Sequence, residues 1–300
     1  MFTQFFGNYL LENSYISIDQ LLKGLNFQSE VKLKLGVLAI NEGYMTSAQV
    51  DKVHHMQKRV DKRFGTLAVD MGYMEDIEVN KLLKSQKQGY LVLGQALVDL
   101  GYISMQKFEK ALDNYKKEYK IDFTDFTKLQ NEKMLQIVED FYKFDSFDNA
   151  IIYTKYVSLL FRNIIRFIGD DFTPLRARKI DEISASNTAV QYISGKYDIY
   201  TGIEGKESVM IELARRVDQY FSGDFDEVVE ASVSEFLNLC NGLFCVNLSN
   251  VNRVELDIEP QEFLKKVTFS DMQDAFFVPV KFTFGVVNFL IVGNIPTIIE

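Results

Sequence analysis

The stretch KLGVLAINEGYM at Lys34–Met45 returns 29 residues later as RFGTLAVDMGYM at Arg63–Met74. The same period extends over roughly the first 116 residues. One column of glycines and a second column seven residues further on keep this spacing: Gly7, Gly36, Gly65 and Gly94, then Ser14, Gly43, Gly72 and Gly101. So many matches at one period indicate four tandem repeats.

Each repeat predicts a pair of short helices. In the second repeat, the apolar residues 38–40 belong to a first helix that ends where Gly43 can adopt the left-handed conformation. Thr46 and Gln49 then have the spacing of a capping box that opens the second helix. A single helix pair cannot cover its own apolar face, so neighbouring repeats must stack on it. We expect this packing to include the tyrosines that follow the second column: Tyr15, Tyr44, Tyr73 and Tyr102.

The bulk composition narrows the class of protein. Three hundred residues are too many for one ordinary core, and 47% hydrophobic with 25% charged residues is a normal globular balance. A net charge of -9 argues against DNA or RNA as the main partner, because a phosphate backbone would repel it. No run of about 18 apolar residues occurs and no secretory signal is evident. These features predict a cytoplasmic protein of two domains.

The few cysteines and histidines exclude several chemistries. Cys240 and Cys245 both lie in an apolar region, which suits a reducing compartment and small core residues. His54 and His55 are adjacent on a predicted helix and point in different directions, so they are poor metal ligands. A Ser-His-Asp hydrolase or a zinc hydrolase is therefore excluded.

Beyond residue 116 the 29-residue register is lost. Residues 117–146 predict a linker and a connecting helix. From 147 to 300 the pattern changes to an α+β domain with a mostly antiparallel sheet, because helices and strands are grouped rather than strictly alternating. The expected helices cover 147–168, 208–221 and 226–241, and the expected strands cover 176–183, 188–194, 198–202, 253–258, 276–283 and 286–292.

One of these helices separates its residues sharply. At about 100° per residue, one face is apolar: Val229, Val233, Phe236, Leu237 and Cys240. The opposite face holds Ala231, Glu235, Asn238 and Gly242. Glu235 and Asn238 are three residues apart, so we expect them side by side in solvent, between two residues with little or no side chain. An ordinary solvated helix face is the alternative interpretation of such a pair.

The repeats resemble the N-terminal domain of type II secretion and MSHA-pilus ATPases over roughly residues 1–116. In a subset of that family the repeats open with R-L-G-x-x-L and bind cyclic di-GMP. The resemblance implies nucleotide binding by Lys34 and Arg63. The matching positions hold Phe5 and Val92, which departs from the family pattern. A protein-docking or dimerising scaffold is the competing role.

The second half resembles the CheX/CheC family of response-regulator phosphatases over about residues 147–293. Four segments follow one another as in that family: IYTGIEG at 199–205, SVMIELARRV at 208–217, SEFLNLCNG at 234–242 and VELDIEP at 254–260. The resemblance implies that Asn238 orients a water against the phospho-aspartate of a CheY-like receiver domain. Glu235 would pair with the receiver's lysine, and Ala231 and Gly242 would line the partner surface.

The same resemblance carries further expectations. The chain would bind no cofactor, because Mg²⁺ is supplied on the response regulator, and a homodimer could form through a sheet edge. An acidic residue or Ser often stands at the position of Ala231, which is a departure here. A second, pseudo-symmetric site would fall on the register Leu160–Asn163, where the Glu position is Leu160, so we expect that copy to be inactive.

The residues therefore leave more than one function open. The first hypothesis is an aspartyl-phosphate phosphatase in chemotaxis or two-component signalling, with the repeats controlling location or activity. The alternative is a non-catalytic receiver-binding adaptor, or one that responds to cyclic di-GMP. A purely structural assembly protein is a third reading.

Overall fold

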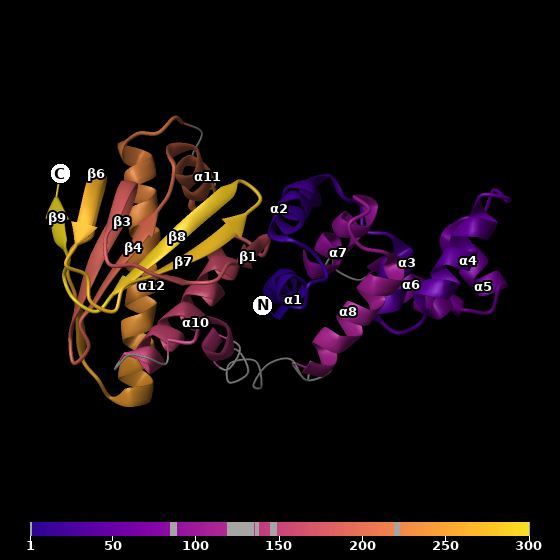
Figure 1. Cartoon of the computed structure of the whole chain (residues 1–300), viewed down its shortest axis with the longest axis horizontal. Coiled ribbons are helices and arrows are strands. Elements are labelled where there is room, and N and C mark those ends of the chain that lie inside the picture. The colour runs from indigo at the N-terminus through magenta and orange to yellow at the C-terminus, as the bar shows by residue number, and fades with distance from the viewer. Residues whose placement is uncertain are drawn as a thin grey trace. The chain divides into compact units, whose positions relative to one another are not determined.

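The computed structural model describes residues 2–84, 89–118, 135, 138–144, 149–218 and 223–299. The chain divides into two compact units, Phe2–Thr124 and Asp125–Glu300 (Figure 1). We call them the N-terminal unit and the C-terminal unit. Most of the predicted connecting segment 117–146 lies outside the described residues.

The described part of the N-terminal unit is helical. Its elements are η1 (Phe2–Phe5), α1 (Phe6–Glu12), α2 (Ile18–Phe27), η2 (Gln28–Glu30), α3 (Leu35–Asn41), α4 (Ser47–Gln57), α5 (Phe64–Asp70), α6 (Asp76–Lys84), α7 (Gly89–Asp99) and α8 (Met105–Glu118). Each repeat thus contributes two successive α-helices. The capping box of α4 is present, since Thr46 N donates to Gln49 Oε1 at 2.7 Å and Gln49 N donates to Thr46 Oγ1 at 3.3 Å.

The second glycine column ends the first helix of each repeat. Gly43, Gly72 and Gly101 have φ of 73°, 70° and 71°, as their position predicts. Ser14 stands in the same column of the first repeat and also has a positive φ, of 55°. A left-handed conformation costs a residue with a Cβ atom free energy that glycine does not lose.

The first glycine column has a different cause, which is close packing inside the second, third and fourth repeats. A Cβ atom on Gly36 would lie 2.7 Å from Val50 Cγ1, and one on Gly65 would lie 2.8 Å from Val79 Cγ1. On Gly94 it would lie 2.1 Å from Phe108 Cε2. The glycine of the first helix therefore makes room for the apolar side chain that the second helix places 14 residues later.

The repeats do not all stack on their neighbours in sequence. One buried cluster joins the second repeat to the third, including Val50, Val53 and Leu82. The other cluster joins mainly the first repeat to the fourth, including Phe6 and Phe108. The expectation of neighbour stacking is therefore wrong for the first and fourth repeats. Burying the apolar side chains of the first and fourth repeats against each other removes their surface from water.

The four recurring tyrosines take part in this packing. Tyr15 and Tyr102 lie against the cluster of the first and fourth repeats, while Tyr44 and Tyr73 lie against the cluster of the second and third. All four are half-buried. Their predicted packing role is confirmed.

The described part of the C-terminal unit is an antiparallel sheet with helices. The strands are β1 (Phe172–Pro174), β2 (Arg178–Lys179), β3 (Ile183–Gly195), β4 (Ile199–Glu204), β5 (Leu256–Ile258), β6 (Glu262–Ser270), β7 (Phe276–Phe282), β8 (Gly285–Val292) and β9 (Thr297–Ile299). They run in the order β1-β7-β8-β4-β3-β6-β9, with β2 also on β7 and β5 also on β3. The helices are α10 (Ala150–Phe167), α11 (Glu207–Val217) and α12 (Glu227–Asn252). Helical content together with this sheet agrees with the expected fold class.

Several predicted boundaries need correction. Strand β6 was not expected, because Lys265 and Lys266 interrupt its alternation and Lys266 has a φ of 54°. The helix expected to end at residue 241 continues to Asn252. Phe244 and Leu248 prolong its buried face by two turns, and this burial outweighs the weak helix propensity of Gly242.

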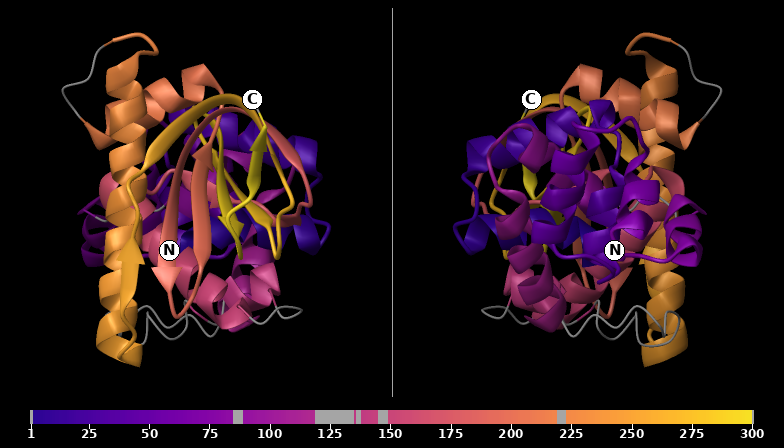
Figure 2. Two further views of the ribbon diagram at one scale, coloured as in Figure 1. Left: turned by 90° about the vertical axis from the view of Figure 1, so that its left-hand side faces the viewer. Right: turned by 90° about the vertical axis from the view of Figure 1, so that its right-hand side faces the viewer.

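Helix α12 is the long helix alongside the sheet (Figure 2). Its five predicted inward residues, Val229, Val233, Phe236, Leu237 and Cys240, are all buried. Burying one such side chain contributes about 2 kcal/mol. This packing fixes the rotation of α12 and decides which of its residues face outward.

Candidate functional site

The start of α12 is held by its own capping group. The Asp226 carboxylate accepts from the backbone N–H of Val228 at 3.0 Å and of Val229 at 3.2 Å. Glu227 and Glu230 lie in the first turn, where their negative charges interact favourably with the positive N-terminal end of the helix dipole. The helix is therefore well anchored two turns before the residues of interest.

The structure places Glu235 on the outward face, where it is exposed. Asn238 Nδ2 lies 3.5 Å from Glu235 Oε2, so the two side chains are neighbours. Ala231 is exposed on one side of the pair. On the other side, a Cβ atom on Gly242 would have nothing within 4 Å. The Glu235–Asn238 pair is therefore accessible from solvent, with no bulky side chain of α12 at Ala231 or Gly242 to block it.

Asn238 differs from the expectation of a side chain standing in solvent. It is half-buried, and its Oδ1 accepts a hydrogen bond of 2.9 Å from Gln191 Nε2 on β3. Sequence reasoning missed Gln191. The available signal was a glutamine in the apolar stretch TAVQYI of a predicted strand, where a buried amide requires polar partners.

Gln191 belongs to a buried network of hydrogen bonds that reaches α10. Its Nε2 also donates to the backbone carbonyl of Glu259 at 2.9 Å, and its Oε1 accepts from Asn241 Nδ2 at 2.8 Å. Asn241 Nδ2 also donates to Thr201 Oγ1 at 2.9 Å, and Tyr156 O–H donates to Asn241 Oδ1 at 2.7 Å. Burial raises the pKa of Tyr156 well above its ordinary value, so this phenol keeps its proton.

The surroundings of Glu235 leave its charge accessible. Among the described residues, Glu235 has no ion pair, whereas Glu230 one turn earlier pairs with Lys265 at 2.5 Å. Val228 and Val246 lie on the same outward stripe as Glu235 and are 50% and 59% exposed. The arrangement is an acid and an amide between two exposed valines, which suits contact with a cation on a protein surface.

The register expected for the second, pseudo-symmetric site is buried. Leu160 is 1% exposed and Asn163 is 4% exposed, so both point into the core. The apolar stripe of α10, which includes Tyr153, Val157 and Ile164, turns Leu160 inward with them. The expectation that this copy is inactive stays a prediction.

The two cysteines are free and buried, as predicted. Burial raises the pKa of Cys240 to about 12 and that of Cys245 to about 11. Both thiols stay protonated at neutral pH and are unsuited to nucleophilic chemistry.

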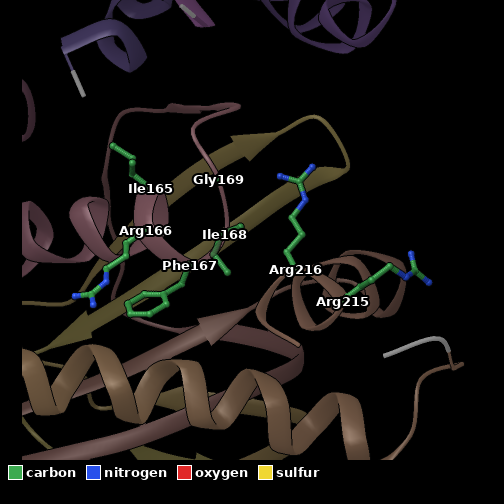
Figure 3. A pocket seen from close by; sticks show the side chains of 7 residues that line it. All are labelled: Ile165, Arg166, Phe167, Ile168, Gly169, Arg215 and Arg216. Atoms are coloured by element: carbon green, nitrogen blue, oxygen red, sulfur yellow. The ribbon is translucent and has the colours of Figure 1, made fainter. Parts of the chain in front are cut away.

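A shallow hollow near the end of α10 is lined by residues 165–169, Arg215 and Arg216 (Figure 3). Two of its three cations are compensated. The Arg216 guanidinium donates to Asp171 Oδ2 at 2.9 Å and stacks on the Phe284 ring at 4.6 Å, and Arg215 pairs with Glu212. The exposed Arg166 lies over the Phe167 ring, with 5.0 Å from its guanidinium carbon to the ring centroid.

The two candidate nucleotide-binding residues, Lys34 and Arg63, occupy matching positions in the second and third repeats. Each is exposed and immediately precedes the first helix of its repeat. Lys34 Nζ is engaged by Asp99 Oδ1 of the fourth repeat at 2.6 Å. A nucleotide would have to compete with this ion pair.

Two further observations concern the described residues. No three or more of their His, Cys, Asp and Glu side chains gather closely enough to hold a metal ion. None of their helices combines the length and the apolar character needed to span a bilayer.

No protein-family model and no curated protein matches this chain. Several solved structures do. The chemotaxis protein CheX from Desulfovibrio desulfuricans is 15% identical, with 47% of this chain and 97% of that chain covered and a TM-score of 0.41. A CheC-like superfamily protein from Shewanella sp. PV-4 is 18% identical, with 47% and 95% covered and a TM-score of 0.41.

A chain of the CheX–CheY–BeF3–Mg²⁺ complex from Borrelia burgdorferi is 16% identical, with 49% and 96% covered and a TM-score of 0.39. The structural neighbours are thus CheX- and CheC-like chemotaxis proteins over about half of this chain. At these identities and TM-scores they carry no argument about activity. The chemistry of the site has to be judged from its own residues.

Proposed function

We propose that this chain is a phosphatase that hydrolyses the phospho-aspartate of a CheY-like receiver domain in chemotaxis or two-component signalling. The observation that carries the proposal is the outward pair of Glu235 and Asn238 on α12, with open space at Gly242. A pair presented in this way can enter a cleft of another protein. An acid and an amide are the two groups that the CheX/CheC resemblance requires.

Such a small site suffices because the reaction demands little. An aspartyl phosphate is an acyl phosphate that already hydrolyses in water, and the receiver supplies its own Mg²⁺, aspartates and lysine. What is missing is a water held in line with the phosphorus atom, so catalysis can come from positioning. A carboxamide can hold that water through a hydrogen bond. Asn238 is the residue in that role.

Glu235 has a separate role, which is docking. Its exposed carboxylate has no ion pair among the described residues, so a lysine on the receiver could form a charge-assisted hydrogen bond with it. The exposed Val228 and Val246 on either side would supply apolar contact. Glu235 thereby sets the register in which Asn238 meets the phosphoryl group.

The experiment follows the loss of phosphate from a labelled receiver. We expect Asn238→Ala to remove the acceleration, about 100-fold or more, with little change in receiver binding. Glu235→Ala should instead weaken binding about tenfold or more. Asn247→Ala is the matched control, because Asn247 is exposed on the same helix but off the outward stripe. A receiver that decays equally fast with wild type and with Asn238→Ala would refute the enzyme.

A non-catalytic receiver-binding adaptor is the second candidate, and Ala231 favours it. Ala231 offers the partner no polar group one turn before Glu235, and α10 presents neither Leu160 nor Asn163 outward. The same assay separates the two candidates, since an adaptor would bind the receiver tightly without shortening the lifetime of its phosphate. Calorimetry with cyclic di-GMP tests the repeats, with Arg63→Ala as the variant. No heat at high micromolar nucleotide would end that reading.

A further inference from the structure

We infer that Gln191 is the positioning residue of the site: it fixes which end of the Asn238 carboxamide faces outward. Its consequence for catalysis rests on the proposed function, but the orientation itself follows from the hydrogen-bond network. Oxygen and nitrogen of a side-chain amide have nearly the same shape, so only their partners decide which is which.

Two backbone carbonyl groups determine the direction of the whole network. The carbonyl of Glu259 can only accept, so the atom of Gln191 that lies 2.9 Å from it must be the donor Nε2. The carbonyl of Gln191 likewise accepts from Thr201 Oγ1 at 3.0 Å. Thr201 has then given away its only proton, so its oxygen must accept from Asn241 Nδ2.

The remaining contacts follow from these two. The second proton of Gln191 Nε2 points at Asn238, which must therefore present its oxygen, Oδ1, at 2.9 Å. Gln191 Oε1 meets Asn241 Nδ2 at 2.8 Å, in agreement with the direction set by Thr201. Reversing the Gln191 amide would place oxygen against the Glu259 carbonyl and against Asn238 Oδ1, and nitrogen against Asn241 Nδ2. All of these contacts would then be unfavourable.

Burial makes this hydrogen-bond network rigid. Gln191 is 2% exposed, and Asn241 and Thr201 are fully buried. Water cannot replace a lost partner there, so the network is either complete or costly. Gln191 lies on β3, Asn241 on α12 and Tyr156 on α10, so the hydrogen-bond network joins two helices to the sheet.

The orientation has a direct chemical consequence. The Asn238 carbonyl oxygen is turned toward the sheet, while Nδ2 lies toward Glu235 and the outward face. The group offered to a bound water is therefore an N–H donor aimed at the water oxygen. An Asn238 side chain free to turn over would also offer its carbonyl oxygen and would order the water poorly.

The test replaces Gln191 and leaves Glu235 and Asn238 unchanged. Gln191→Met keeps the size of the side chain and removes its hydrogen bonds. Dephosphorylation of the receiver should fall about 10- to 100-fold in kcat while KM stays unchanged. Thr188→Val is the matched control, because Thr188 is a buried polar residue on the same strand whose Oγ1 has no hydrogen-bond partner among the described residues. In the Asn238→Ala background, Gln191→Met should cause no further loss, whereas a merely structural role would lower both rates.

A second measurement does not depend on activity. In ¹⁵N-labelled protein, the Asn238 side-chain NH₂ group should be as ordered as the backbone of α12, and this order should fall in Gln191→Met but not in Thr188→Val. If wild type fails to accelerate dephosphorylation while this pattern holds, the proposed function fails and the positioning stands. A disordered Asn238 amide in wild type, or an unchanged one in Gln191→Met, would overturn the inference. If Gln191→Met fails to fold, the order of the Asn238 amide in wild type still tests the inference by itself.

Discussion

The two units of this protein use their polar groups in different ways. In the N-terminal unit, surface contacts join the repeats, such as Lys34 with Asp99 and Lys81 with Tyr44. In the C-terminal unit, buried amides join segments 40 to 85 residues apart and end at the half-buried Asn238. The residues that recur in every repeat serve packing. The candidate chemistry depends instead on residues outside the repeats, namely Glu235, Asn238 and Gln191.

The largest expected effect tests the packing half of this comparison. Gly94→Ala should destabilise the N-terminal unit by about 3 kcal/mol, because its Cβ atom would lie 2.1 Å from the buried ring of Phe108. Gly101→Ala is the control from the same repeat. Its Cβ atom would meet nothing, so it should cost only about 1 kcal/mol for the left-handed backbone. Urea unfolding monitored by hydrogen exchange along the chain gives the stability of each unit separately. Equal losses of stability in Gly94→Ala and Gly101→Ala would contradict the assignment of the first glycine column to packing and of the second to backbone conformation.

A smaller effect distinguishes the units by pH. Burial lowers the pKa of His54, which packs on the Phe64 ring, and the chain has no histidine in its C-terminal unit. Above pH 6.5 both folded and unfolded His54 are neutral. As pH falls below 6.5, the unfolded state takes up the proton first, so stability of the N-terminal unit declines until the folded pKa is passed. Because His54 is only half-buried, solvent screening keeps the expected loss between pH 7 and 5 below about 1 kcal/mol.

The measurement is the unfolding midpoint of each unit at pH 7, 6 and 5. His54→Gln should flatten the dependence in the N-terminal unit and leave the C-terminal unit unchanged. A C-terminal unit that lost as much stability over this range would show that other groups control the effect.

The smallest effect concerns the one repeat that departs from the second glycine column. Ser14→Gly should stabilise the N-terminal unit by about 0.5–1 kcal/mol, because φ at this position is 55°. Thermal unfolding would show a raised midpoint. A lowered midpoint would mean that the serine side chain contributes more than its backbone costs.

The parts of the structure that sequence could predict are those set by local spacing. The glycine turns, the capping boxes and the buried face of α12 all follow from residues within one or two helical turns. Gln191 could not be assigned to Asn238, because 47 residues separate them and only the strand register of β3 brings them together. Strand β6 was missed for a similar reason, since pairing with β3 overrides the poor alternation around Lys266.

The pairing of the first repeat with the fourth sets a limit on how this chain can vary. In an open stack, a further copy simply adds one more layer. Here the outer members of the series bury each other, and the fourth also contacts the second through Lys34 and Asp99. A tandem duplication inside the series would have to push apart Phe6 and Phe108 and expose both. Copy number is thereby fixed by closure, and gain or loss of a single repeat should be far less tolerated than in an open array.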